Sequence, residues 1–265
     1  DNEKVDLSKR NQTIWLYLYG DSTTRQLMGS VIEENTGNVI RNRELKEYVR
    51  EKCMPQVEAA NYKPNHQFGG APCYKNERTC HMNFEGKGMK LTYDWKHFPL
   101  EPHDSYLFGK KNSFFSNVSR DVQKKTYIIT GMGLHLCSHT TTPTGRKNLT
   151  HEKLLESDIH TYIHKAKSTF KGDMILLPDS KYKWGTENHH YDQERCMNGK
   201  ALALNRAARQ TDGVHVVDRA KINLDSSNIN DNWAMHRSAF VTLVTWQHIK
   251  ALINTLEIMK AETNR

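Results

Sequence analysis

The chain has 265 residues, of which 37% are hydrophobic and 26% charged, and its formal net charge at pH 7 is +8. This length and apolar content favour a single domain, residues 1–265, with a substantial core. No stretch approaches the roughly 20 apolar residues that cross a bilayer. The opening sequence DNEKVDLSKR is polar. We therefore expect neither a membrane segment nor a signal peptide within these residues.

The positive charge indicates an acidic partner, such as a sialylated or sulfated glycan, a phosphorylated cofactor or nucleic acid. The basic residues are scattered rather than gathered into a stripe, and no stacking aromatics alternate with them. Nucleic-acid-binding modules usually show one of these features, so we expect no nucleic-acid partner. Most of the lysines are interpreted as a solvated surface.

The first predicted elements are a strand at residues 14–19 and a helix at residues 23–33, separated by Gly20-Asp21-Ser22. The carboxyl end of a strand is where open α/β sheets place their ligands. A hydroxyl on Ser22 would stand at a helix N-terminus, which favours an anion or a developing oxyanion. The alternative is that Asp21 or Ser22 only caps the helix.

The later segments alternate between helix and strand patterns. Residues 44–52 favour a helix, and about 53–88, rich in Gly, Pro, Asn and charge, favour an ordered insertion or long loop. The expected strands then cover 89–98, 125–136, 173–177 and 214–218, with helices at 151–170, 200–210 and 237–260. Residues 105–116 are expected to form a loop or short helix. This alternation predicts a parallel sheet covered by helices on both faces.

The five cysteines contain no C-x-x-C pair, which argues against a structural zinc site. Cys73 and Cys80 bracket a polar segment and are a candidate disulfide in an oxidising compartment. The alternative is that all five cysteines are reduced and buried. Pairing of the remaining three cannot be deduced from the sequence.

Three N-glycosylation acceptor patterns begin at Asn11, Asn117 and Asn148. Together with the candidate disulfide they favour the secretory pathway, either the Golgi lumen or the extracellular space.

An activated serine needs an imidazole to accept its proton and usually a carboxylate to orient that ring. His236 follows the fifth predicted strand and immediately precedes the last helix, and Asp231 lies five residues earlier. The rival pair is Asp212 and His215. It falls at the start of the fifth strand, on the far side of the sheet from Ser22, and is interpreted as part of a helix-to-strand turn.

Oxyanion donors are expected from the backbone N–H of Ser22 and from the loop after the third strand, through Gly133 or the His135 side chain. The alternative is that Gly131 and Gly133 merely relieve strand packing. The sequence HHYD at residues 189–192 lacks a clear H-x-x-x-H pair, and no metal site is predicted.

The sequence GDSTTRQ at residues 20–26 resembles the GDSxxRQ block of the PC-esterase branch of the SGNH (GDSL-like) hydrolase superfamily. It is most similar to the carboxyl-terminal domain of the neurexophilin and PC-esterase (NXPE) proteins. Further blocks follow in the same order: Gly133-Leu134-His135, Asn205-Arg206, Val217-Asp218 and a late Asp/His loop. The resemblance covers about residues 12–256.

This resemblance implies a flavodoxin-like three-layer sandwich with about five parallel strands, and a serine that carries an acyl group. It implies O-acetyltransferase or esterase activity on carbohydrate hydroxyls, a substrate-side role for Arg25, no bound cofactor, and acetyl-CoA as a candidate acyl donor. The chain departs from the family where relatives place the acid three residues before the histidine, because Trp233 stands there. Asp231 would then reach in from a longer loop, or a weakened dyad would operate, or the chain would be an inactive glycan- or protein-binding ectodomain.

Overall fold

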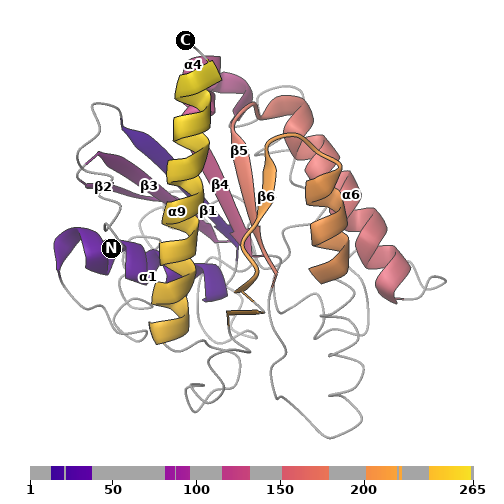
Figure 1. Cartoon of the computed structure of the whole chain (residues 1–265), viewed down its shortest axis with the longest axis horizontal. Helices are drawn as coiled ribbons and strands as arrows, with labels where there is room; N and C mark the ends of the chain where they lie inside the picture. Colours follow the sequence, from indigo (N-terminus) through magenta and orange to yellow (C-terminus); the bar gives the residue numbers. More distant parts are fainter. Residues whose placement is uncertain are drawn as a thin grey trace, which may run out of the picture.

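The structure is a computed structural model in which six strands form one sheet between helices (Figure 1). The described residues are 13–20, 22–37, 81–86, 88–95, 115–131, 151–178, 201–219, 221–222 and 239–263. The strands are β1 (Ile14–Gly20), β2 (His81–Gly86), β3 (Met89–Trp95), β4 (Thr126–Gly131), β5 (Asp173–Leu177) and β6 (Val214–Val216). The helices are α1 (Ser22–Thr36), the 3-10 helix η4 (Phe115–Asn117), α4 (Arg120–Lys124), α6 (His151–Thr169), α9 (Ala239–Thr263) and an unlabelled helix at 201–209.

The strand order is β2-β3-β1-β4-β5-β6. β1 pairs in parallel with both β3 and β4, and β5 and β6 continue the parallel arrangement. Only β2 runs antiparallel in the described sheet, along β3 at its edge. The five parallel strands have the flavodoxin-like order, in which the first strand lies between the second and the third. The predicted α/β class with a parallel sheet of about five strands is confirmed.

Two apolar clusters fill the space on either side of the sheet. One packs α1 and α9 against alternate residues of the strands, such as Leu16, Leu18 and Ile129. The other packs α6 and the 201–209 helix against the opposite faces, including Tyr17 and Ile128. Every residue of β1 is buried, because the strand is covered on both faces. The result is the expected three-layer sandwich.

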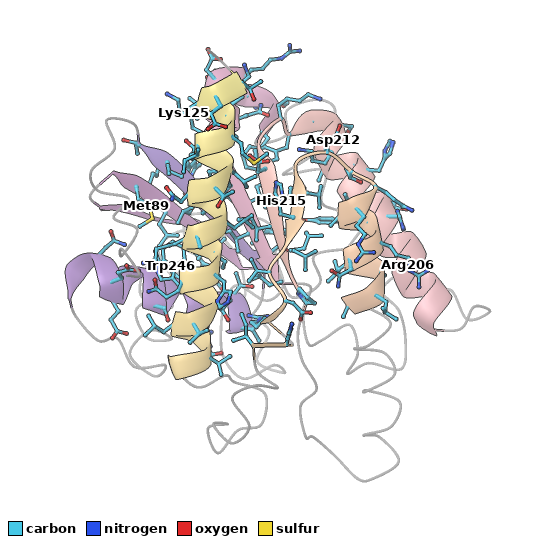
Figure 2. The ribbon with its side chains drawn as sticks, viewed as in Figure 1. Met89, Lys125, Arg206, Asp212, His215 and Trp246 are labelled. Atoms are coloured by element: carbon cyan, nitrogen blue, oxygen red, sulfur yellow. The ribbon has the colours of Figure 1, made fainter. Side chains whose placement is uncertain are left out.

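The helices α1 and α9 are also joined by polar contacts. The Glu34 carboxylate accepts hydrogen bonds from the Trp246 indole and the Lys250 ammonium. Figure 2 shows Trp246 on α9. The N-terminal helix of the described chain is thereby held on the same face as the C-terminal helix. Among the helices of the described ranges, none is long and apolar enough to span a bilayer.

Several elements differ from the sequence-based expectation. Residues 81–86, expected to be loop, form β2, which pairs with β3 through a turn at Gly88 with φ +67°. The fifth parallel strand ends at Val216, because the chain turns at Asp218, whose side chain accepts a hydrogen bond from the Lys221 N–H. The short helix α4 was not expected, and Ser119 caps it by accepting from the Val122 N–H. Residues 44–52, 96–98 and 132–136 lie outside the described residues.

Candidate active site

The strand order reverses between β1 and β4. After β1 the chain forms α1 and later β3, which lies on one side of β1. The next strands, β4, β5 and β6, lie on the other side of β1. Tyr19 near the end of β1 is opposite Thr130 near the end of β4. In sheets of this order, ligands bind at the reversal, outside the carboxyl ends of the strands. The candidate site is therefore where β1 and β4 end and α1 begins (Figure 1).

The turn from β1 to α1 requires glycine. Gly20 has φ +153°, a conformation that other residues rarely adopt. A Cβ at this position would lie 2.4 Å from Thr24 Oγ1 and 3.0 Å from the Gly131 carbonyl oxygen. With one residue between them, β1 ends at Gly20 and α1 begins at Ser22. The predicted strand, turn and helix over residues 14–33 are confirmed.

The start of α1 is suited to an anion. The first N–H groups of a helix have no acceptor within the helix, and the aligned peptide dipoles give this end a partial positive charge. The helix has 15 residues and carries no acidic side chain in its first turn. Ser22 opens this turn. The backbone here can therefore donate to an oxyanion.

Side chains from three elements meet beside this turn. Arg219, from the segment after β6, donates from Nη2 to Thr23 Oγ1 at 3.1 Å. Arg219 is 2% exposed and Thr23 is 1% exposed. A Cβ on Gly131, at the end of β4, would lie 2.8 Å from Thr24 Oγ1 and 3.4 Å from Arg219 Nη2. We call these residues, with Gly20, the carboxyl-edge cluster.

The same edge holds buried hydroxyls without partners. Thr24 Oγ1 and Thr130 Oγ1 are buried and have no hydrogen-bond partner among the residues that the structure describes. The nearby Tyr93 hydroxyl donates to the Gly20 carbonyl across a long 3.5 Å. An unsatisfied buried hydroxyl costs about 1–3 kcal/mol. Natural proteins accept such local costs mainly at functional sites, which supports the location of the candidate site here.

Of the predicted site residues, two fall within the described ranges. Ser22 is placed through its backbone at the start of α1. Arg25 lies in the same first turns of α1 and is 5% exposed, so it belongs to the buried part of this helix. The remaining predicted catalytic and oxyanion residues, Gly133, His135, Asp231 and His236, lie outside the described residues, as do the Ser22 side chain and Asp21.

The predicted modifications are mostly beyond the described ranges as well. Asn117 ends η4 and is exposed. Asn11, Asn148, Cys73 and Cys80 lie outside the described residues. Glycosylation and the Cys73–Cys80 disulfide stay predictions.

The rival histidine lies away from Ser22. His215 is in β6, three strand positions from β1, which corresponds to about 14 Å across the sheet. Its Nε2 lies 3.1 Å from Oδ1 of Asp173, the first residue of β5. Figure 2 shows His215 on β6. Asp212 is exposed in the turn before β6. This confirms that His215 stands at the start of the fifth parallel strand, pointing toward the amino ends of the strands.

His215 belongs to a polar cluster at the opposite edge of the sheet. Asp173 Oδ2 lies 2.8 Å from Lys260 Nζ in α9, and Lys260 also donates to the Tyr127 hydroxyl at 3.0 Å and to Glu257 at 3.2 Å. The Tyr127 hydroxyl donates in turn to Glu257. We call these five residues the amino-edge cluster.

Charges in the amino-edge cluster are mutually compensated. Burial raises the pKa of Asp173, but hydrogen bonds from His215 and Lys260 outweigh this effect and hold its pKa below the usual value. Burial lowers the pKa of the neighbouring Lys167, although Asp173 counteracts part of the change. Compensated, hydrogen-bonded charges of this kind fasten α9 to the sheet.

Sequence reasoning missed Thr23, Thr24 and Arg219 as members of the site. Arg219 follows a predicted strand at its carboxyl end, which is the same criterion that selected His236. The same criterion could have predicted Arg219 as a site residue. For Thr23 and Thr24, only their position next to the glycine turn could have done so.

Comparison with known proteins gives matches among solved structures. No family model matches the chain. No curated protein matches it either. Among solved structures, the chain is similar to a catalytic mutant of Axe2, an acetylxylan esterase from Geobacillus stearothermophilus, with 13% sequence identity, 92% of this chain and 96% of that chain covered, and a TM-score of 0.48. The chemistry of this chain therefore has to be inferred from its own residues.

The described residues also offer no ready metal site. No group of three or more His, Cys, Asp or Glu side chains within the described ranges could hold a metal ion.

Proposed function

We propose that the chain is a serine-dependent O-acetyl esterase or O-acetyltransferase that acts on carbohydrate hydroxyls. The observation that carries the proposal is the position of Ser22. It opens α1 directly after the Gly20 turn, at the reversal of the strand order. A hydroxyl in this place has oxyanion donors beside it before the reaction starts. The GDSTTRQ sequence supports the same assignment.

In the proposed reaction, Ser22 Oγ attacks the acetyl carbonyl carbon while His236 accepts the hydroxyl proton. The carbonyl oxygen becomes an oxyanion, stabilised by the Ser22 N–H and by the Gly133 region, including His135. The carbon–oxygen bond to the sugar then breaks, and the protonated His236 returns the proton to the leaving hydroxyl. Water or a second sugar hydroxyl then attacks the acetyl carbon and gives its proton to His236. The bond from that carbon to Ser22 Oγ breaks, and His236 returns the proton to Oγ. Asp231 orients the imidazole.

Esterase and transferase share all these parts and differ in what takes the acetyl group. The net charge of +8 supports an acidic sugar as substrate or acceptor, or the phosphates of acetyl-CoA as donor. Assays should therefore compare acetylated neutral and acidic sugars, with and without acetyl-CoA. Release of free acetate identifies the esterase, and acetate that appears on an added sugar identifies the transferase.

The test is Ser22→Ala against Ser30→Ala. Both serines lie in α1, but Ser30 is two turns further along the helix. Ser22→Ala should lower turnover of acetyl esters by at least about 10³-fold, whereas Ser30→Ala should leave it within about twofold. Circular dichroism confirms that both variants fold. Unchanged turnover in folded Ser22→Ala would end the proposal.

A second candidate function is a catalytically silent binding ectodomain for a glycan or protein. The observation that favours it is Trp233 at the position where the resemblance expects an acid. A phosphonate probe that labels activated serines distinguishes the two candidates. Covalent capture at Ser22 rejects the binding module, and glycan binding without capture supports it.

We further propose that this chemistry takes place in the secretory pathway. The support is the set of three acceptor patterns, one of which, Asn117, is exposed. Expression through a secretory route followed by glycosidase digestion should reduce the apparent mass. Asn117→Gln should remove one glycan, and no change in mass in either experiment would reject the assignment.

A further inference from the structure

Arg219 is among the largest fully buried side chains of the described chain. A guanidinium carries five N–H donors and stays charged in proteins. Removing it from water is costly unless hydrogen bonds hold it in place. Its position beside α1 therefore demands a reason beyond the filling of space.

One hydrogen bond of Arg219 joins two residues that are far apart in the sequence. Its Nη2 donates to Thr23 Oγ1, 196 positions earlier in the chain. The same nitrogen lies against the end of β4, since a Cβ on Gly131 would come within 3.4 Å of it. One guanidinium thus packs against both elements that border the reversal of the strand order.

The hydrogen bond joins parts of the chain that are far apart in sequence. Thr23 lies in the first turn of α1, next to Ser22, and Arg219 follows β6. A guanidinium that donates to Thr23 and lies against Gly131 links the first turn of α1 to the end of β4.

We infer that Arg219 is a positioning residue of the carboxyl-edge site. Through Thr23 it holds the first turn of α1, and with it Ser22, against the end of β4. The chemical consequence rests on the proposed function, whereas the holding of the helix rests only on the carboxyl-edge cluster.

The experiment uses graded variants on both sides of the contact. Thr23→Val removes the acceptor with almost no change in shape, and Thr23→Ser keeps it. Arg219→Met removes the charge and the donors, and Arg219→Lys keeps the charge but replaces the planar guanidinium with a single ammonium group. Arg209→Met is the matched control, because Arg209 is exposed on the 201–209 helix.

Two readouts are measured on the full chain. The first is kcat and KM for 4-nitrophenyl acetate. Thr23→Val and Arg219→Met should lower kcat by about 100-fold with KM changed by less than about threefold, since a small misplacement of the nucleophile has effects of this size. Arg219→Lys should be intermediate, and Thr23→Ser and Arg209→Met should stay within about threefold of the unaltered chain.

The second readout is amide hydrogen exchange in peptides covering residues 22–30. Exchange in the first turn of α1 should be faster in Thr23→Val and Arg219→Met and unchanged in the control. Unchanged exchange in both variants overturns the inference, whatever the activity. If Arg219→Met does not fold, Thr23→Val decides alone.

The two proposals fail in different ways. If the unaltered chain hydrolyses no ester and binds no phosphonate probe, the proposed function is rejected, while faster exchange in Thr23→Val still supports the holding of α1 by Arg219. If the chain is active and Thr23→Val keeps both kcat and exchange rates, the positioning role is rejected and the proposed function stands.

Discussion

The two edges of the sheet are built from similar polar materials and used in opposite ways. At the amino edge, both carboxylate oxygens of Asp173 have partners, His215 and Lys260. At the carboxyl edge, Thr24 and Thr130 are buried with hydroxyls that have no partner among the described residues. The Asp173 carboxylate is therefore satisfied within the described part of the chain, whereas these two hydroxyls are not.

This difference indicates that one edge stabilises the fold and that the other suits a chemical reaction. Fully paired polar groups make an element rigid, which suits the attachment of α9 through Lys260. At the carboxyl edge, the N–H groups at the start of α1 and the buried Thr24 and Thr130 hydroxyls, which have no partner among the described residues, suit a site where an anion forms. We infer that the carboxyl edge holds the reactive site and that the amino edge attaches α9 to the sheet.

The largest effect is expected at the glycine turn. Gly20→Ala should lower the free energy of unfolding by about 3 kcal/mol, because alanine is strained at φ +153° and its Cβ would overlap Thr24 Oγ1. It should also lower kcat by about 100-fold, since relief of the overlap moves the start of α1. Urea unfolding and ester hydrolysis measure the two effects.

Gly37→Ala is the matched control for this prediction. Gly37 has φ +72° at the other end of α1, and nothing lies within 4 Å of a Cβ built there. Its cost should be about 1 kcal/mol of backbone strain, with activity unchanged. Equal losses of activity in Gly20→Ala and Gly37→Ala would show that the carboxyl edge has no special role.

The next effect breaks the amino edge. Asp173→Asn removes the charge that faces Lys260 and His215 while keeping the shape of the side chain. The free energy of unfolding should fall by about 1–2 kcal/mol, because a partly buried lysine loses a partner. Ester hydrolysis should stay within about twofold, and a larger loss would mean that the two edges are coupled.

Much of the fold could be predicted from the sequence because its signals are local. A strand buried on both faces is a short run of apolar residues, as in β1 and β5, and the glycine turn marks where α1 begins. β2 was missed because the short alternating run HMNFEG lies at the end of a segment, about 53–88, whose Gly, Pro, Asn and charged residues favour a loop. Its structure comes from pairing with β3, which is a tertiary effect.

The candidate site was less predictable because some of its contacts join residues that are far apart in the sequence. Ser22 and the turn were identified because the whole signal lies within a few residues. The contact between Arg219 and Thr23 joins residues 196 positions apart, and neither flanking sequence encodes the other. Only the topology brings the end of β6 next to the start of α1. Topology likewise separated His215 from Ser22.

A smaller effect concerns acid. The pKa of Asp173 is lower in the folded chain than in the unfolded chain, where it takes its usual value of about 4. The stabilisation is therefore complete above about pH 4 and is lost as the pH falls through the lower, folded pKa. The difference in unfolding free energy between the unaltered chain and Asp173→Asn should shrink as the pH falls from about 4 toward 3. A constant difference down to pH 3 contradicts the assigned pairing.

The smallest effect is expected for an exposed ion pair at the same edge, which serves as a comparison for the buried Asp173. Asp121 in α4 lies 3.9 Å from Lys124, but its side chain is 91% exposed, compared with 12% for Asp173. Water screens an exposed pair, so Asp121→Asn should change the free energy of unfolding by less than about 0.5 kcal/mol. Parallel urea titrations of the two Asp→Asn variants measure the contrast. If both variants lost the same stability, the burial of Asp173 would add nothing to the stability of the chain. The amino-edge cluster would then have no special role in fastening α9 to the sheet.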